Sequence, residues 1–179
     1  MFVPHILSCK RTAHTARLKW ALCGFIDMIN VTDEIQKAID TLCLSENDYR
    51  KMTEDVSGNL INDFVETFVD GGDRKWWWEA FKIKPIHRIT SHPNPFRLIV
   101  PIVPDPSEKL WFVVEDDSSL HYPVYEANAR VIEKVIGECF GFEYYLIPKD
   151  KQWLLCENHH NVLIGIGKQI ENGFIKHAT

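Results

Sequence analysis

Five short apolar runs in the second half of the chain limit its fold most strongly. They are FRLIVPIV (96–103), LWFVVED (110–116), FEYYLIP (142–148), QWLLCEN (152–158) and VLIGIG (162–167), and the last three close the chain. Such runs, rich in β-branched and aromatic residues, are typical of strands. The connections PDPSEK, KDK and HHN are short, which predicts antiparallel hairpins. Since the last run has no polar alternation, we expect a central strand or one covered on both faces.

The N-terminal third has helical periodicity instead. Thr32, followed by two acidic residues, is typical of a helix N-cap, and apolar residues recur after it at helical spacing. Ser45 begins a second, short helical segment, and a third helix, over 60–69, ends at two glycines. A further helix is expected over about residues 127–140. The sequence therefore predicts a single α+β domain over 28–179, with N-terminal helices packed on a mostly antiparallel sheet and one inserted helix.

Residues 1–27 are predicted to be an extension outside the domain, because Met28 is followed at once by a well-formed helix start and provides an alternative start site. Four of the 20 basic residues but only one of the 25 acidic residues lie in this extension, which leaves the domain 16 basic and 24 acidic residues, a formal charge of −8. A domain with this negative charge repels nucleic acid and favours basic partners. No apolar run approaches the roughly 20 residues that span a bilayer, so no membrane contact is expected.

The cysteines and the missing motifs narrow the class of protein. Five cysteines, an odd number without CxxC spacing, indicate reduced thiols in a cytoplasmic protein. The sequence has no phosphate-binding glycine loop, nucleophile elbow or HExxH motif. We therefore expect no cofactor.

Residues 156–160, CENHH, combine the residue types of metal sites and of catalytic dyads. The spacing lacks the paired ligands of zinc sites, and Cys156 lies between apolar residues, as a buried neutral thiol does. We interpret the segment as a hairpin corner in which Asn158 and Asn161 bond to the backbone, while the two imidazoles point apart. No metal ligand and no catalytic residue is predicted.

Three consecutive tryptophans, Trp76, Trp77 and Trp78, cannot share one face of any regular element, so at least one is expected at a boundary or rim. One interpretation is an aromatic binding surface to which Arg88 adds polar contacts, because tryptophans commonly anchor protein partners. The other is a set of core tryptophans that cover the junction between helices and sheet. The sequence leaves both open.

Three carboxylates, Glu115, Asp116 and Asp117, close the second predicted strand. Such a group would suit Mg²⁺ or Ca²⁺, although a run of this kind is more often a solvated loop. Together with the charge of the domain, it also fits an acidic patch for a basic protein. No metal is predicted here.

Several of these stretches also carry a resemblance to a known family. They are Trp76–Trp78, VPDPSEKLWFVVED (103–116), PVYE (123–126) and VIGECFGFEYYLIPKDKQWLLCENHHNVLIGIG (135–167). Over about residues 30–170 the chain resembles a bacterial family known only as a domain of unknown function. This resemblance implies a small, soluble, stand-alone bacterial protein without an established activity, so it assigns no catalytic residues. The order of helices, tryptophan-led strands and acidic charge is also similar to that of SMI1/KNR4-type (SUKH) immunity proteins, which bind and neutralise toxins.

The leading hypothesis is a non-enzymatic cytoplasmic protein-binding module, in its narrower form an immunity protein, that binds a basic protein through an acidic and aromatic surface. The expected binding residues are Trp76, Trp77, Trp78, Glu115, Asp116, Asp117, His159 and His160. The alternative is a metal-dependent or cysteine-dependent hydrolase centred on Cys156, Glu157, His159 and His160. A third hypothesis is a structural subunit of a larger assembly.

Overall fold

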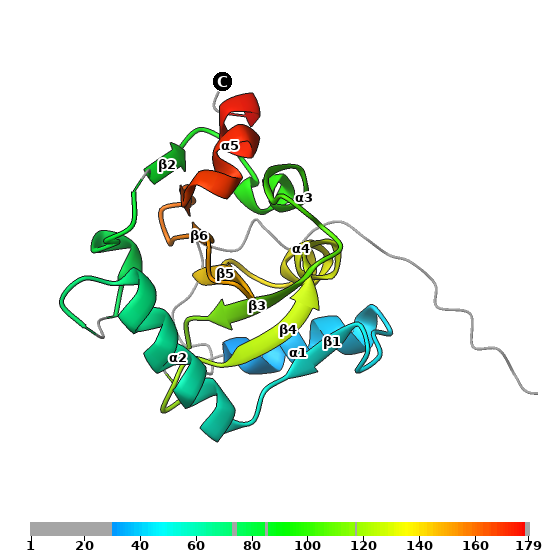
Figure 1. Cartoon of the computed structure of the whole chain (residues 1–179). Helices are drawn as coiled ribbons and strands as arrows, with labels where there is room; N and C mark the ends of the chain where they lie inside the picture. The colour runs from blue at the N-terminus through cyan, green and yellow to red at the C-terminus, as the bar shows by residue number, and fades with distance from the viewer. Residues whose placement is uncertain (1–29, 73–74, 85, 117, 178–179) are drawn as a thin grey trace, which may run out of the picture.

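The computed structural model describes residues 30–72, 75–84, 86–116 and 118–177, and the predicted extension 1–27 lies outside them. The centre of the described part is a seven-stranded sheet (Figure 1). The strands are β1 (Tyr49–Lys51), β2 (Ile86–Ile89), β3 (Lys109–Val114), β4 (Val124–Asn128), β5 (Tyr144–Pro148), β6 (Leu154–Glu157) and β7 (Leu163–Ile166). Their order is β1-β4-β3-β5-β6-β7-β2, and every neighbouring pair is antiparallel. The predicted antiparallel sheet is confirmed.

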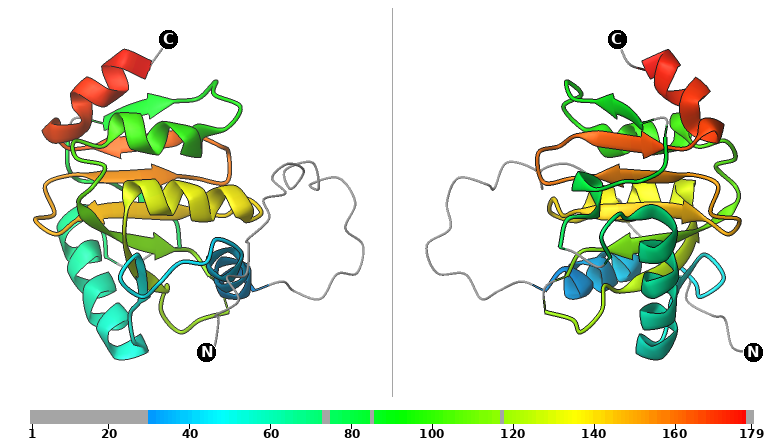
Figure 2. Two further views of the ribbon diagram at one scale, coloured as in Figure 1. Left: turned by 90° about the vertical axis from the view of Figure 1, so that its right-hand side faces the viewer. Right: turned by 60° about the vertical axis from the view of Figure 1, so that its left-hand side comes forward.

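Helices cover both faces of this sheet (Figure 2). They are α1 (Val31–Thr41), α2 (Glu54–Phe68), α3 (Ile99–Ile102), α4 (Ala129–Glu138) and α5 (Glu171–His177), with the short 3-10 helices η1 (Trp77–Glu79), η2 (Pro95–Leu98) and η3 (Lys168–Ile170). α1, α3, α4 and α5 pack on one face, and α2 and η1 on the other. α4 is the predicted inserted helix, so the α+β fold is confirmed. No helix in the described part of the chain is long and apolar enough to cross a membrane.

Alternate residues of the central strands enter two separate cores. In β3, Phe112 joins the core under α4, whereas Val113 joins the core under α2. In β6, Leu155 likewise joins the core under α4, and Cys156 joins the core under α2. Every residue of β5, β6 and β7 is buried. This cover on both faces explains why the last apolar run has no polar face.

The first apolar run was predicted as a strand, and this prediction is wrong. Residues 96–103 form η2, α3 and the residue after it, and β3 pairs with β4 and β5 instead. Pro95 begins η2, where a missing N–H costs no hydrogen bond. Phe96, Ile99 and Val103 are buried at helical spacing. A short apolar run fits a strand or a helix, and burial of one helical stripe favours the helix here.

Two predictions near α1 are also corrected. Asn30 is the N-cap in place of Thr32, because its side-chain oxygen accepts a hydrogen bond from the backbone N–H of Thr32 at 2.8 Å. The segment that begins at Ser45 is a turn, not a helix. The carboxylate of Asp48 accepts hydrogen bonds from the backbone N–H and the hydroxyl of Ser45, so the chain turns directly into β1.

The chain does not end on a strand pair as predicted, because η3 and α5 follow β7. Gly165 of β7 lies directly beneath α5: a Cβ there would stand 2.5 Å from Cδ1 of Ile170 and nearer still to the ring of Phe174. Gly173 of α5 lies in the same way against the backbone of Ile102 in α3. The glycines therefore allow the last helix to lie close to the sheet and to α3.

We expect Gly165→Ala to destabilise the protein by about 1–3 kcal/mol, because the added methyl group would push α5 away from β7. Gly137→Ala is the matched control. Its Cβ would lie 3.4 Å from the Phe96 ring, an ordinary contact, within helix α4, and alanine favours a helix by about 1 kcal/mol over glycine. The measurement is urea unfolding of both variants. Equal stability of the two would contradict the packing described for α5.

Candidate functional site

Four strand ends meet at one end of the central sheet. The last residue of β3, Val114, is opposite the first of β5, Tyr144, which is opposite the last of β6, Glu157. Glu157 is in turn opposite the first residue of β7. The residues just beyond these ends are therefore neighbours, and the backbone N–H of Glu115 donates to the carbonyl of Glu143 at 3.0 Å.

The carboxylate of Glu143 is the centre of this region, although its residue is only 5% exposed. Its Oε1 accepts hydrogen bonds from the backbone N–H of His159 at 2.7 Å and from Nδ1 of the same residue at 2.5 Å. Its Oε2 accepts from Nε1 of Trp78 at 3.3 Å. A buried carboxylate needs such donors to offset its loss of water. Glu143 thus ties the β6–β7 turn to the tryptophan segment.

Four aromatic side chains gather around this carboxylate, and we call Trp76, Trp78, His159 and His160 the ring cluster. The ring centroid of Trp76 lies 6.5 Å from that of Trp78 and 5.4 Å from that of His159. Trp78 lies 5.8 Å from His159 and 5.9 Å from His160. These are the separations of rings in direct contact. Trp76 is 37% exposed and the His159 side chain 41% exposed, so the cluster is open to solvent.

The two histidines do not point apart, which corrects the prediction made for the turn. Their ring centroids are 4.0 Å apart. The side chain of Asn158 accepts from the backbone N–H groups of His160 and Val162, and Asn161 adopts a positive φ of 56°. This tight turn bends the backbone sharply enough to bring the neighbouring rings together. The predicted hairpin with a bonded Asn158 is confirmed.

Trp77 lies in the core, not at the surface where the binding hypothesis had placed it. It is fully buried, and its ring centroid is 4.8 Å from that of Tyr145 in β5. η1 therefore turns its middle tryptophan inward and leaves Trp76 and Trp78 at the rim. The core interpretation therefore holds for Trp77, and the expected rim position holds for Trp76, whereas binding by the exposed rings stays a prediction.

Of the predicted acidic group, Glu115 and Asp116 are described, and their surroundings differ. Asp116 is buried and accepts hydrogen bonds from Ser118 and, at 2.9 Å, from the hydroxyl of Thr32. Burial opposes ionisation, but the bonds from Ser118 and Thr32 outweigh it and lower the pKa of Asp116. Asp116 therefore fixes the β3–β4 connection to α1. Glu115 is half-buried beside Glu143, and Asp117 lies outside the described residues.

The cysteine in the CENHH segment is sealed in the core. Cys156 is fully buried under α2, and burial raises the pKa of its thiol well above the ordinary value. Glu157 points to the opposite face, where its carboxylate accepts from the hydroxyl of Tyr144 at 2.7 Å. Among the described residues, no group of three or more His, Cys, Asp or Glu side chains is placed to hold a metal ion.

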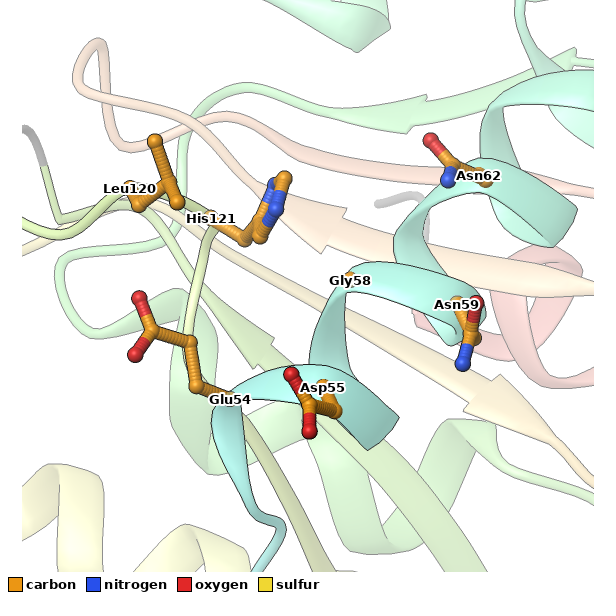
Figure 3. A pocket seen from close by; sticks show the side chains of 7 residues that line it. All are labelled: Glu54, Asp55, Gly58, Asn59, Asn62, Leu120 and His121. Atoms are coloured by element: carbon orange, nitrogen blue, oxygen red, sulfur yellow. The ribbon is translucent and has the colours of Figure 1, made fainter.

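A second feature is an open hollow of about 510 Å³ beside the first half of α2 (Figure 3). Leu120 and His121, from the β3–β4 connection, face the helix across it. The His121 ring lies over Gly58, where a Cβ would be 3.0 Å from its Cδ2 atom. The remaining lining residues are polar: Glu54, Asp55, Asn59 and Asn62. This hollow was not predicted, although a glycine within an amphipathic helix indicates a close approach of this kind.

Glu143, the central residue of this candidate site, was not predicted from the sequence. It is an isolated acid before a buried strand, and no motif marks it. The pairing register of the β5–β6 hairpin would have predicted its position. A turn at KDK pairs Tyr144 with Glu157, so the residue before β5 lies opposite the residues that follow β6.

The chain belongs to a family of unknown function (DUF6756), which it matches over residues 27–177. The resemblance to a domain of unknown function is thereby confirmed. Neither the curated proteins nor the solved structures gave a significant match to this chain. Nothing in these comparisons links the chain to the SMI1/KNR4-type immunity proteins.

We expect Glu143→Gln to destabilise the protein by about 1–3 kcal/mol, since an amide offers one acceptor oxygen where the buried carboxylate has two. The near-ultraviolet circular dichroism of the tryptophans should change as well, because Trp78 loses its partner. The control is Glu138→Gln, an exposed residue at the end of α4, for which we expect a change within about 0.5 kcal/mol. Unfolding curves that coincide for the two variants would refute the role given to Glu143.

Proposed function

We propose that this family member is a non-enzymatic binding protein that holds a basic segment of a protein partner against the ring cluster. The observation that carries the proposal is the convergence of four aromatic side chains, from chain segments some 80 residues apart, over one buried carboxylate. Exposed tryptophans fixed in this way are typical anchors of protein interfaces. Since Glu143 holds Trp78 and His159 in place, little conformational entropy of these two side chains is lost on binding.

Charge favours a basic partner. The domain carries a formal charge of −8, and Glu115 and Glu143 lie at the same end of the sheet as the rings. Tryptophan faces attract Lys and Arg side chains. Inside this protein, the ammonium group of Lys149 lies 2.8 Å from the ring centroid of Trp111 and shows the same type of contact.

The distances between the rings of the ring cluster favour an open binding surface, not a cage that encloses a cation. A cation held between two rings needs each centroid within about 6 Å on opposite sides. The rings here pack directly on one another, with centroids 4.0 to 6.5 Å apart. A partner would therefore cover the cluster from outside, as an interface residue does.

The proposal includes a bacterial, cytoplasmic location. The described cysteines Cys139 and Cys156 are buried free thiols, which suits a reducing compartment. An immunity role, in which the partner is a toxin, is the narrower form of the proposal. It is supported by the similarity in the order of elements noted from the sequence.

The binding test uses dye-labelled peptides of alternating arginine and glycine, or glutamate and glycine, titrated with the full chain. We expect the arginine peptide to bind and the glutamate peptide not to bind. Trp76→Ala should weaken binding at least about tenfold, equivalent to about 1.4 kcal/mol. The control is Ile175→Ala, which removes another exposed apolar side chain, 64% exposed on α5. Equal affinities of the two variants would rule out the ring cluster as the binding surface.

The hydrolase alternative makes a different prediction for the thiols. We expect iodoacetamide not to modify Cys139 or Cys156 in the folded protein, because both are buried and the pKa of Cys139 is raised to about 12. Peptide mapping by mass spectrometry measures each site, and the urea-unfolded chain is the positive control. Rapid modification of Cys156 in the folded state would instead favour a cysteine-dependent enzyme.

A further inference from the structure

We propose that protonation of the His159–His160 pair controls the ring cluster, so that a basic partner bound at neutral pH is released on mild acidification. This inference rests on the proposed function, because it concerns the regulation of the same surface. It is carried by the contact between two neighbouring imidazoles above a single buried carboxylate.

The Nδ1 atom of the His159 ring is hydrogen-bonded to Glu143. An ionised carboxylate accepts hydrogen bonds but cannot donate one. The Nδ1 atom of His159, which lies 2.5 Å from the Glu143 carboxylate, therefore carries the proton in this contact. The backbone N–H of the same residue donates to the same oxygen. A proton gained by this ring therefore enters at Nε2, and the charge that results is balanced by Glu143.

No carboxylate in the described part of the chain is bonded to the His160 ring in this way. Among the described residues, its ring contacts the rings of His159 and Trp78, and only its backbone N–H has a hydrogen bond, to the side chain of Asn158. A second proton on the pair would place two positive charges on rings whose centroids are 4.0 Å apart. Glu143 balances one of these charges, so the second makes the surface less negative.

The other charged groups around the pair set the negative charge to which the imidazoles would add. Beyond Glu143, the neighbouring strand ends carry Glu115, which is half-buried, and Glu157, which is buried and bonded to Tyr144. The segment with the two tryptophans adds one base and one acid, Lys75 and Glu79. In the proposed switch, the two imidazoles at the surface supply the change of charge. As they become positive, they repel an arginine side chain that approaches Trp76 or Trp78.

The test measures the affinity of the arginine–glycine peptide at about pH 7.5 and about pH 5.5, the range over which histidines usually change charge. We expect affinity to fall at least about tenfold in the unmodified chain and less than about threefold in His160→Gln. His121→Gln is the matched control, since His121 is an exposed histidine outside the ring cluster, and it should retain the full pH dependence.

The outcomes separate this inference from the function on which it rests. If Trp76→Ala abolishes peptide binding but the affinity is the same at both pH values, the proposed function holds and the regulation does not. A pH dependence that His160→Gln leaves unchanged overturns the regulation in the same way. Absence of peptide binding at either pH overturns both.

A second readout requires no peptide. Protonated imidazoles quench a neighbouring indole, and Trp78 contacts both histidines. We expect the tryptophan fluorescence of the free protein to fall on acidification, and the fall to be smaller in His160→Gln but not in His121→Gln. Identical titration curves for the three proteins would show that the pair does not change charge in this range, which would overturn the inference.

Discussion

The central strands of this protein have no polar face, and this constraint determines much of the rest of the structure. Because every residue of β5, β6 and β7 is buried, both sides of the sheet must be covered by other elements. α2 covers only part of its side, and Trp77 packs on Tyr145 beyond it. When the middle tryptophan of three enters the core, its neighbours remain at the rim. The exposed aromatic surface is thus a consequence of how the sheet is covered.

The parts of the fold that depend on local pattern could be predicted from the sequence. The hairpin at residues 159–161 followed from short turns between apolar runs, and the burial of Cys156 from its apolar neighbours. The run 96–103 was assigned wrongly because its length and composition suit a strand and a helix alike. α5 was missed because the signal for it is a pair of contacts made by Gly165 and Gly173, and contacts between distant segments leave little trace in local periodicity.

For the candidate site too, local features could be predicted from the sequence and contacts between distant segments could not. The tryptophan run and the two histidines were identified separately, since each is unusual in composition. That they touch depends on the register of three strands and on the path of the segment before η1, which no local pattern encodes. Glu143, which joins them, is an ordinary acid in the sequence. Its importance comes from its burial and from its three hydrogen bonds.

The joining of distant segments at Glu143 also relates the surface to the folding of the whole chain. Neither the β6–β7 turn nor the tryptophan segment can arrange the rings alone, so the surface exists only after the β5–β6–β7 hairpins have formed and η1 has docked. Contacts between such distant residues require closure of a long stretch of chain, whose entropic cost must be met by the rest of the fold. A ligand that recognises the assembled rings would therefore select fully folded molecules and, by mass action, protect them against unfolding and proteolysis.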